Sequence, residues 1–469
     1  MHKLNNKDLE DYLDSFLGED SESFLVAKPE STAIRVNTLK NSKLEIENWF
    51  KQLKQKFSKI PFSQNGFIIP QDDIPFSHTL DFFLGKIQYQ GISSQLPALV
   101  LNPQPGEKVL DMAAAPGSKS TQIGAMMQNK GSLYLNDISR QRLQALNANT
   151  QKAGMLNQVL LNYSGDRFGN LFPKFFDKIL LDAPCTALGT LSSSPEVTGW
   201  WSREKLHKLC GIQERLFISA IKALKTGGEM VYSTCSIAPE ENEMLIQEML
   251  DEYPLEILPI DLRGTENFKN GLSSYDGIPF DPNMKHALRV FPHQHEMEGF
   301  FVARLRKTKG HVLHQEWKRA SFTETMAYDD EQVGQDLKEI SETYGIPVDF
   351  WQDYRFIRTQ KRLWMTNRDL KEIPADGVTS AGMLLAEKKQ FMWKLFNQSA
   401  QYLNELVKKR RLAFTKEQML EIFTNGKMDL PGIGNGYYVI EWQGKVVASI
   451  YVEKEKGQMR LPHKFRLVL

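Results

Sequence analysis

Two cysteines stand where a thiol could act as a nucleophile. Cys185 lies in the segment DAPC and Cys235 in the segment STCS, and each segment follows a stretch that predicts a buried strand, residues 177–181 and 228–232. Ligands of open α/β sheets bind beyond the carboxyl ends of the strands, so both thiols are expected to face one pocket. Without a CxxC pair, the three cysteines argue against a disulfide framework or a structural zinc site.

The segment VLDMAAAPGSKSTQIGAMM, residues 109–127, predicts a strand, a loop of small residues and a helix. A doubly wound sheet binds its ligand at such a helix N-terminus. Of a dinucleotide-binding GxGxxG pattern only Gly117 is present, and Ser118 separates it from Lys119, which breaks the P-loop spacing. Both phosphate-binding interpretations therefore fail. S-adenosylmethionine, which carries no phosphate, fits this loop, and an ordinary turn without a ligand is the alternative.

Two thiols beside a methyl donor suggest methylation at carbon 5 of cytosine. A thiolate that adds to carbon 6 turns the ring into an enamine, and carbon 5 can then attack the methyl group. The ring nitrogen must take up a proton, and Asp182, three residues before Cys185, is the candidate acid. A second cysteine can assist the final release. The alternative is that both cysteines are buried and inert, which is the interpretation we adopt for Cys210 within its helical pattern.

Two absences narrow this chemistry. The segment DAPC differs from the [DNS]PP[YFW] motif that is common in enzymes that methylate exocyclic nitrogens. Thr186 and Ala187 follow Cys185, whereas DNA cytosine methyltransferases place their nucleophile in a PCQ context. Neither of these two classes therefore matches the chain.

Alternating strand and helix patterns over residues 89–307 predict the sheet that positions these groups. Strand 132–136 ends at Asp137, 20 residues after Gly117, a spacing at which a carboxylate contacts ribose hydroxyls. A helix N-cap is the alternative role of that acid. Strand 157–162 leads to Ser164 and Asp166, the candidate adenine contacts. Residues 290–291 and 299–303 are expected to form a closing hairpin.

The flanking regions predict smaller modules. Residues 1–88 are expected to form an α+β module with a helix over 7–17, a strand over 33–38 and a helix over 42–57 that begins with a capping box. Lysines on that second helix favour a solvated face over RNA contact. Residues 308–385 lack a clean period and are expected to be an intermediate region or linker. Residues 386–469 predict a β-rich module with strands at 436–442, 445–452 and near 465–468.

Composition places few limits on function. The 469 residues suggest about three domains, and 41% hydrophobic with 25% charged residues is typical of a soluble protein. A net charge of +1 neither requires nor excludes nucleic acid. The N-terminus lacks an apolar signal core, and no apolar run is long enough for a membrane span. We therefore expect a cytoplasmic protein.

Three segments, LDMAAAPGSKSTQI, LLDAPCTALGT and YSTCSIAPEENE, resemble the motifs of the Nop/Sun family of RNA cytosine-5 methyltransferases, and the resemblance extends over residues 89–307. It implies a Rossmann-like class I methyltransferase sheet, S-adenosyl-L-methionine as cofactor and no metal. It also implies that Cys235 is the nucleophile and that Cys185 assists product release. The implied cofactor contacts are Ala113, Ala114, Ala115, Pro116, Gly117, Ser118, Lys119, Asp137, Asp166 and Asp182, with Ser164 standing where the family usually has an acid.

The arrangement of modules narrows the resemblance to the bacterial RsmF type. A short N-terminal module and a C-terminal PUA-like module imply RNA binding, with 16S rRNA in the small ribosomal subunit as the substrate. Methylation of tRNA or another RNA is one alternative, and a noncatalytic ribosome-assembly factor is the other. Three basic clusters are expected to anchor RNA, within residues 355–368, 408–411 and 460–466.

Overall fold

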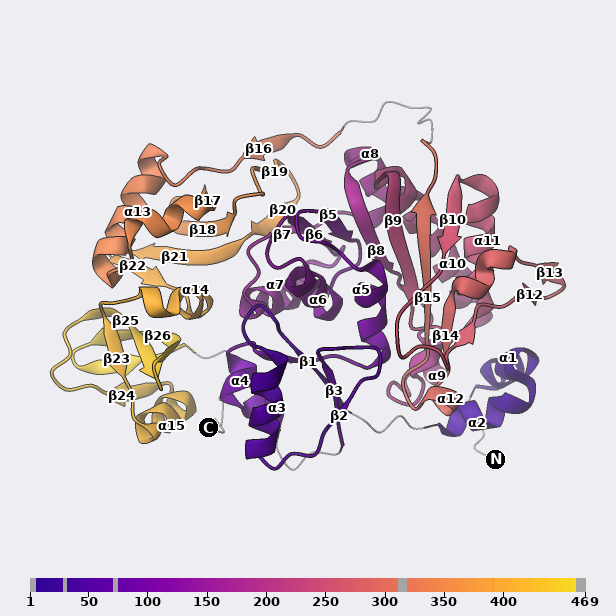
Figure 1. Ribbon diagram of the computed structural model, residues 1–469, viewed down its shortest axis with the longest axis horizontal. Helices are drawn as coiled ribbons and strands as arrows, with labels where there is room; N and C mark the ends of the chain where they lie inside the picture. Colours follow the sequence, from indigo (N-terminus) through magenta and orange to yellow (C-terminus); the bar gives the residue numbers. More distant parts are fainter. Residues whose placement is uncertain (1–5, 28–31, 71–74, 311–318, 391, 461–469) are drawn as a thin grey trace.

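A computed structural model describes residues 6–27, 32–70, 75–310, 319–390 and 392–460. Figure 1 shows a large central sheet with its helices, a small module below it and two further β-rich regions at the left. In the described part of the chain no helix is both long and apolar enough to cross a membrane.

Five parallel strands form the middle of the central sheet in the order β9-β8-β5-β6-β7. Antiparallel strands extend it on both sides. The parallel strands are β5 (Lys108–Asp111), β6 (Ser132–Asn136), β7 (Gln158–Leu161), β8 (Phe176–Asp182) and β9 (Leu224–Thr234). The antiparallel strands are β10 (Leu255–Leu258), β11 (Lys269–Asn270), β14 (Leu288–Val290), β15 (Phe300–Lys307) and β20 (Val378–Ala381). The predicted α/β class is confirmed.

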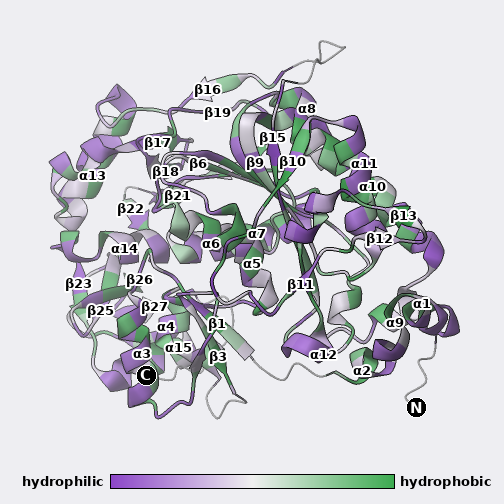
Figure 2. Cartoon of the chain, turned by 45° about the vertical axis from the view of Figure 1, so that its right-hand side comes forward, coloured by the Kyte–Doolittle hydropathy of each residue, from purple (hydrophilic) through white to green (hydrophobic). Residues whose placement is uncertain are grey.

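Helices cover both faces of this sheet, which explains why its strands are almost continuously apolar. Val109 and Leu180 pack with Ile123 and Leu146 on one face, whereas Ile179 and its neighbours pack on the other. The first face carries α5 (Leu96–Leu101), α6 (Ser118–Met126) and α7 (Arg140–Ala153), and the second carries α8 (Phe168–Leu171), α10 (Arg203–Ala223) and α11 (Glu243–Glu252). Figure 2 shows the peripheral α13 (Glu331–Tyr344) as largely hydrophilic.

The N-terminal module has a four-stranded sheet in the order β2-β3-β1-β4. Its elements are β1 (Thr32–Val36), α3 (Lys43–Gln52), β2 (Ser58–Lys59), β3 (Gly66–Ile69), α4 (Leu80–Phe83) and β4 (Ile87–Tyr89). The predicted capping box of Ser42 and Glu45 begins α3. The helix ends five residues before the predicted limit, because Lys54 adopts a left-handed backbone with φ of 55° and breaks the helical path.

Two N-terminal helices, α1 (Lys7–Leu17) and α2 (Ser21–Val26), lie apart from this module (Figure 1). Leu9, Tyr12 and Leu13 are buried against Leu188 and Ile237, which belong to the loops after β8 and β9. Near them lie the short helices α9 (Val197–Trp200) and α12 (Pro292–His295). The first described helix of the chain therefore supports the loops that carry the two cysteines.

The region after residue 318 folds into its own elements and also contributes to the central sheet. Helix α13 (Glu331–Tyr344) buries Val333, Leu337, Ile340 and Tyr344, a helical spacing that the many surrounding charges mask in the sequence. The strands are β16 (Phe322–Glu324), β17 (Tyr354–Arg358), β18 (Arg362–Asn367), β19 (Glu372–Pro374), β21 (Met383–Lys389) and β22 (Met392–Leu395). The boundary expected near residue 385 thus falls inside β21. Strand β20 lies antiparallel along the β7 edge of the central sheet.

The C-terminal module is a five-stranded sheet in the order β23-β25-β26-β27-β24. Its elements are α14 (Asn397–Leu403), β23 (Arg411–Ala413), α15 (Lys416–Asn425), β24 (Lys427–Asp429), β25 (Gly436–Trp442), β26 (Lys445–Glu453) and β27 (Lys456–Gln458). The two predicted strands joined by the turn at Gln443 and Gly444 are confirmed as β25 and β26. The strand expected near residues 465–468 lies outside the described residues.

Candidate active site

The sulfur atoms of Cys185 and Cys235 lie 3.3 Å apart. The register of the central sheet explains this contact, because Asp182 of β8 pairs with Ser233 of β9 and the two cysteines follow these residues by three and two positions. Both loops leave the sheet at the same edge. The two thiols, which were expected to face one pocket, thus lie in contact at one edge of the sheet.

A buried carboxylate holds the loop of Cys185. Glu241 is fully buried and accepts hydrogen bonds from the Thr186 amide at 2.8 Å, from the Thr186 hydroxyl and from the Gln213 amide at 3.0 Å. Burial raises the pKa of Glu241, an effect that outweighs the opposite effect of these donors. Glu241 therefore fixes the backbone directly after Cys185.

The loop of Cys235 is held by the same short segment of chain. Asn242 accepts from the Thr234 hydroxyl at 2.7 Å and donates to the Ser236 carbonyl at 3.1 Å. The Cys235 carbonyl accepts from the Gly189 amide at 2.9 Å, which joins the two cysteine loops directly. The sequence interpretation assigned no role to residues 239–242, although the PEEN letters stand inside one of the three motifs and could have indicated it.

An ion pair lies beside the two sulfurs. Lys119 contacts an Asp182 carboxylate oxygen at 2.8 Å, and the Ser233 hydroxyl donates to the other oxygen at 2.7 Å. Burial acts to lower the pKa of Lys119, but the attraction of Asp182 and, to a smaller extent, of Cys235 leaves that pKa raised. Lys119 therefore carries a positive charge between the candidate acid and Cys235.

The two thiols differ in their surroundings. The hydrogen bond with Cys235 and then burial raise the pKa of Cys185 well above the ordinary value of a thiol. Either sulfur can donate in this contact, and the raised pKa keeps the Cys185 thiol protonated at neutral pH. Cys210 lies apart from this pair on α10, in another cavity, where burial raises its pKa to about 12.

The loop of residues 113–117 connects β5 to α6 and lies next to these groups. Ala114 donates to the Asn136 carbonyl at 2.7 Å, which ties the loop to the end of β6. Gly117 precedes the helix with φ of 107°, a conformation that L side chains rarely adopt. The first-turn amides of α6 therefore face the end of the sheet beside a loop of small side chains.

Asp111 is a further candidate that the sequence interpretation did not select. It is the last residue of β5 and is buried, and its Oδ2 atom accepts from Ser120 at 2.7 Å. The Oδ1 atom has no hydrogen-bond partner among the described residues. Burial raises the pKa of Asp111 to about 7. A ligand at this strand end would find an unsatisfied oxygen.

Asp137, the candidate ribose contact, is engaged within the chain. Its Oδ1 atom accepts from the Ser139 amide at 2.8 Å, and Arg142 Nη1 lies 3.1 Å from Oδ2. Arg142 also donates to the Ala115 carbonyl, so its guanidinium spans the two loops. The alternative role of Asp137 as a helix N-cap is wrong, because α7 is capped by Ser139, whose hydroxyl accepts from the Arg142 amide at 3.3 Å.

The two candidate adenine contacts differ in exposure. Ser164 is half-buried at the start of a short 3₁₀ turn, and Asp166 is exposed within that turn. Neither side chain forms a hydrogen bond with the loop of residues 113–117 in the described structure. In the part of the chain that the structure describes, no group of three or more His, Cys, Asp or Glu residues is arranged to hold a metal ion.

The predicted basic clusters are partly neutralised by acidic neighbours. In the first cluster Arg358 pairs with Asp336 at 2.6 Å and Arg362 with Glu387 at 3.2 Å. In the second, Arg411 pairs with Glu441 at 2.7 Å. Of the third, only residue 460 lies in the described part of the chain. Their contact with RNA stays a prediction.

Comparison with known protein sequences supports the resemblance to RNA cytosine-5 methyltransferases. The sequence model of the family described as "16S rRNA methyltransferase RsmB/F" matches residues 98–306. A tRNA (cytosine(49)-C(5))-methyltransferase of Pyrococcus abyssi is 35% identical over 312 residues, which span 66% of this chain and 97% of that protein. The ribosomal RNA small subunit methyltransferase F of Vibrio parahaemolyticus is 30% identical over 446 residues, 91% of this chain and 90% of that protein. With the same-named protein of Klebsiella pneumoniae, identity is 38% but the match spans 58% of its length.

Solved structures of methyltransferases also resemble this chain. A methyltransferase homolog from Pyrococcus horikoshii superimposes with a TM-score of 0.57 at 35% identity, over 63% of this chain and 93% of that one. NSun6 from the same organism, solved with SFG, gives a TM-score of 0.56 at 26% identity over 65% and 98%. The chain thus belongs to the RsmB/F group of the Nop/Sun RNA cytosine-5 methyltransferases.

Proposed function

We propose that this protein transfers a methyl group from S-adenosylmethionine to carbon 5 of a cytosine in 16S rRNA, with Cys235 as the nucleophile. The observation that carries the proposal is the 3.3 Å contact between the Cys185 and Cys235 sulfurs beside the Lys119–Asp182 ion pair. A cation next to the thiols favours a reactive pair over buried, inert cysteines, because a cation stabilises a thiolate.

We assign the role of nucleophile to Cys235 because of the groups near its sulfur. A nearby cation and a donated hydrogen bond both stabilise a negative sulfur, and Lys119 and Cys185 are placed to supply them. As the sulfur bonds to carbon 6, the double bond between carbons 5 and 6 opens and the ring nitrogen takes up a proton. We assign the delivery of that proton to Asp182, with the Lys119 ammonium as the adjacent proton source.

Cys185 acts after methylation. The largest cause of its raised pKa is the hydrogen bond with Cys235, and that partner changes once the Cys235 sulfur is bound to carbon 6. Cys185 then gives up its own proton to solvent, and its thiolate accepts the proton that leaves carbon 5. As this proton leaves, the double bond between carbons 5 and 6 re-forms, the bond between carbon 6 and the Cys235 sulfur breaks, and the ring nitrogen returns its proton to the pair of Asp182 and Lys119.

The loop of residues 113–119 and its neighbours fit S-adenosylmethionine, which supplies the activated methyl group when bound. The unpartnered Oδ1 of Asp111 and the small side chains of the loop are features that a compact ligand would use. Asp137 would hold the ribose through its Oδ2 atom, which has no hydrogen-bond partner among the described residues. Ser164 and Asp166 remain the proposed contacts on the adenine side.

The relatives favour 16S rRNA over tRNA. The Vibrio parahaemolyticus protein, named for small-subunit ribosomal RNA, matches 91% of this chain, whereas the Pyrococcus abyssi tRNA enzyme matches 66%. The longer match includes the modules outside the central sheet, to which we assign RNA binding within the small subunit. Bisulfite sequencing of total RNA from a deletion strain distinguishes the two substrates, because only the true target cytosine loses its protection.

Two cysteine variants test the mechanism with labelled methyl transfer to ribosomal RNA. Cys235→Ala is expected to abolish transfer and leave cofactor binding intact. Cys185→Ala is expected to accumulate a covalent RNA–protein adduct, which denaturing gels detect. Unchanged turnover of Cys235→Ala would refute the assignment. Absence of transfer by the wild type to any ribosomal particle would instead favour a noncatalytic assembly factor.

A further inference from the structure

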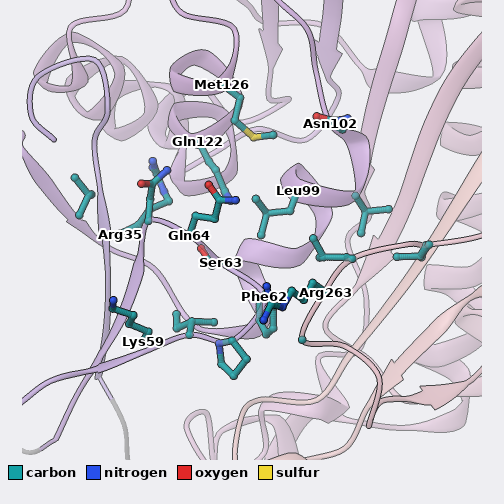
Figure 3. Close-up of a pocket in the computed structure, with 18 of the residues that line it drawn as sticks. Arg35, Lys59, Phe62, Ser63, Gln64, Leu99, Asn102, Gln122, Met126 and Arg263 are labelled. Atoms are coloured by element: carbon teal, nitrogen blue, oxygen red, sulfur yellow. The ribbon is translucent and has the colours of Figure 1, made fainter. Parts of the chain in front are cut away.

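A large cavity of the described structure lies apart from the two cysteines. It has a volume of about 880 Å³ and lies between the N-terminal module, helices α5 and α6, and the loop after β10 (Figure 3). None of the groups assigned to catalysis or cofactor binding lines it. Five basic residues line the cavity against two acidic ones, Asp261 and Glu266. The walls therefore favour an anionic ligand.

Arg35 is the buried cation of this cavity. It is 3% exposed and pairs with no carboxylate among the described residues. Its Nε donates to Gln90 at 2.6 Å, and its Nη2 lies within hydrogen-bonding distance of Thr121 at 2.8 Å and Gln88 at 3.1 Å, whereas Nη1 has no hydrogen bond among the described residues. Burial lowers the pKa of Arg35 to about 9, so the guanidinium stays charged at neutral pH. A buried charge of this kind is costly unless a partner neutralises it.

Two exposed cations stand at the opening. Figure 3 shows Lys59 on the N-terminal module and Arg263 on the opposite side of the cavity. Arg263 makes no hydrogen bond among the described residues, and Lys59 contacts only Glu47, at 3.3 Å, which does not line the cavity. Amide side chains such as Gln64 and Gln122 lie between these charges. Cations spaced along amide-rich walls suit a phosphodiester strand with bases.

Helix α6 connects this cavity to the catalytic centre. Arg35 donates to the Ser118 carbonyl, in the first turn of α6, at 3.3 Å. Gln122 and Met126, further along the same helix, line the cavity. Helix α6 therefore runs from the loop of residues 113–117 to the wall of the cavity beside Arg35.

We propose that this cavity binds the RNA strand that flanks the target cytosine, with Arg35, Lys59 and Arg263 contacting phosphate groups. The inference rests on the proposed function and adds a second RNA contact outside the catalytic centre. Each phosphate contact to a single strand contributes about 0.7 to the slope of log affinity against log salt.

The double variant Lys59→Glu with Arg263→Glu tests the proposal. Two RNAs are compared, one that carries the target cytosine with its flanking strands and one trimmed to the loop that contains the cytosine. For the long RNA we expect Kd and KM to rise at least about tenfold and the salt slope to fall by about 1.4, twice the single-contact value. For the short RNA the change should stay below about twofold. Lys51→Glu with Lys56→Glu is the control, because it alters net charge equally on exposed residues of the same module that do not line the cavity.

Three outcomes would overturn the proposal. The first is an equal loss of affinity for both RNAs in the double variant. The second is an unchanged slope of log affinity against log salt, and the third is an equal loss of affinity in the control variant. Binding of free cytidine monophosphate with the affinity of the long RNA would assign the cavity to a nucleotide instead. If the wild type methylates neither RNA, the proposed function fails. If it methylates both and the double variant keeps the wild-type KM, only the cavity assignment fails.

Discussion

The buried ion pair of Glu243 and Arg289 gives the sharpest stability prediction. The two side chains are 0% and 2% exposed and meet through two contacts of 2.6 and 2.5 Å. Arg289 also donates to the Ile237 carbonyl at 2.9 Å, two residues after Cys235. The change Glu243→Gln keeps the shape of the side chain but leaves the arginine charge buried without a counter-charge.

The cost follows from the burial of the pair. Breaking a buried ion pair by removing one partner costs about 3–5 kcal/mol. For a domain of this size each kcal/mol shifts Tm by about 2–4 °C, so the variant should melt about 6–20 °C below the wild type. Because Arg289 also holds the loop of Cys235, methyl transfer should fall at temperatures where the variant is still folded.

Thermal unfolding followed by circular dichroism measures the shift. The double variant Glu243→Leu with Arg289→Met should recover much of the lost stability, since no unpaired charge remains. Asp353→Asn is the control, because its pair with Arg368 is 3.2 Å long and both side chains are more than two-thirds exposed. A Glu243→Gln variant that melts within about 2 °C of the wild type would refute the reasoning, because the arginine would then be stable without its partner.

Three further predictions concern the catalytic edge. Asp111 holds its proton up to about pH 7 when folded but ionises near 3.8 when unfolded, so its contribution to stability falls as pH rises between these values. The stability of Asp111→Asn relative to the wild type should therefore increase from about pH 4 to about pH 7 in urea titrations and then stay constant. Gly117→Ala strains a backbone at φ of 107° and should cost about 1–3 kcal/mol in unfolding and weaken cofactor binding in calorimetry. Glu241→Gln offers an amide to the donors of Thr186 and Gln213 and should lower kcat at unchanged KM.

A specific result would contradict each of these three predictions. A stability difference between Asp111→Asn and the wild type that is constant with pH would mean that the carboxyl group is not held protonated. Gly199→Ala, at a position with an ordinary φ and no neighbouring atom within 4 Å, is the control for Gly117→Ala and should bind the cofactor normally. A Glu241→Gln enzyme with wild-type kcat would show that the cysteine loops keep their geometry without that carboxylate.

The elements that were predicted most accurately are those whose ends are determined by residues close in sequence. The strand 132–136 and the helix 7–17 match β6 and α1 because apolar spacing and flanking polar residues define both ends. The meeting of Cys185 and Cys235 was predictable because parallel strands end at one edge. The parts that escaped prediction depend on distant partners. The motif around Glu241 could have indicated a role for this residue, but its partner Thr186 lies 55 residues earlier and is known only from the fold.

The region after residue 308 escaped prediction for a similar reason. The burial of α13 depends on strands up to residue 395, and its exposed charges dilute the apolar period. Strand β20 is only four residues long, and it is a strand because β7 lies beside it. Short strands of this kind have little intrinsic preference and take their conformation from the edge that they join.

The position of β20 has a consequence for dissecting the chain. It supplies hydrogen bonds to β7, which would otherwise expose its backbone as an open edge. A fragment that stops after residue 307 would keep every catalytic group yet present that edge to other molecules. Such a fragment is expected to self-associate, and a shortened protein for crystallisation or RNA soaking should retain residues 319–390 or cover the edge in another way.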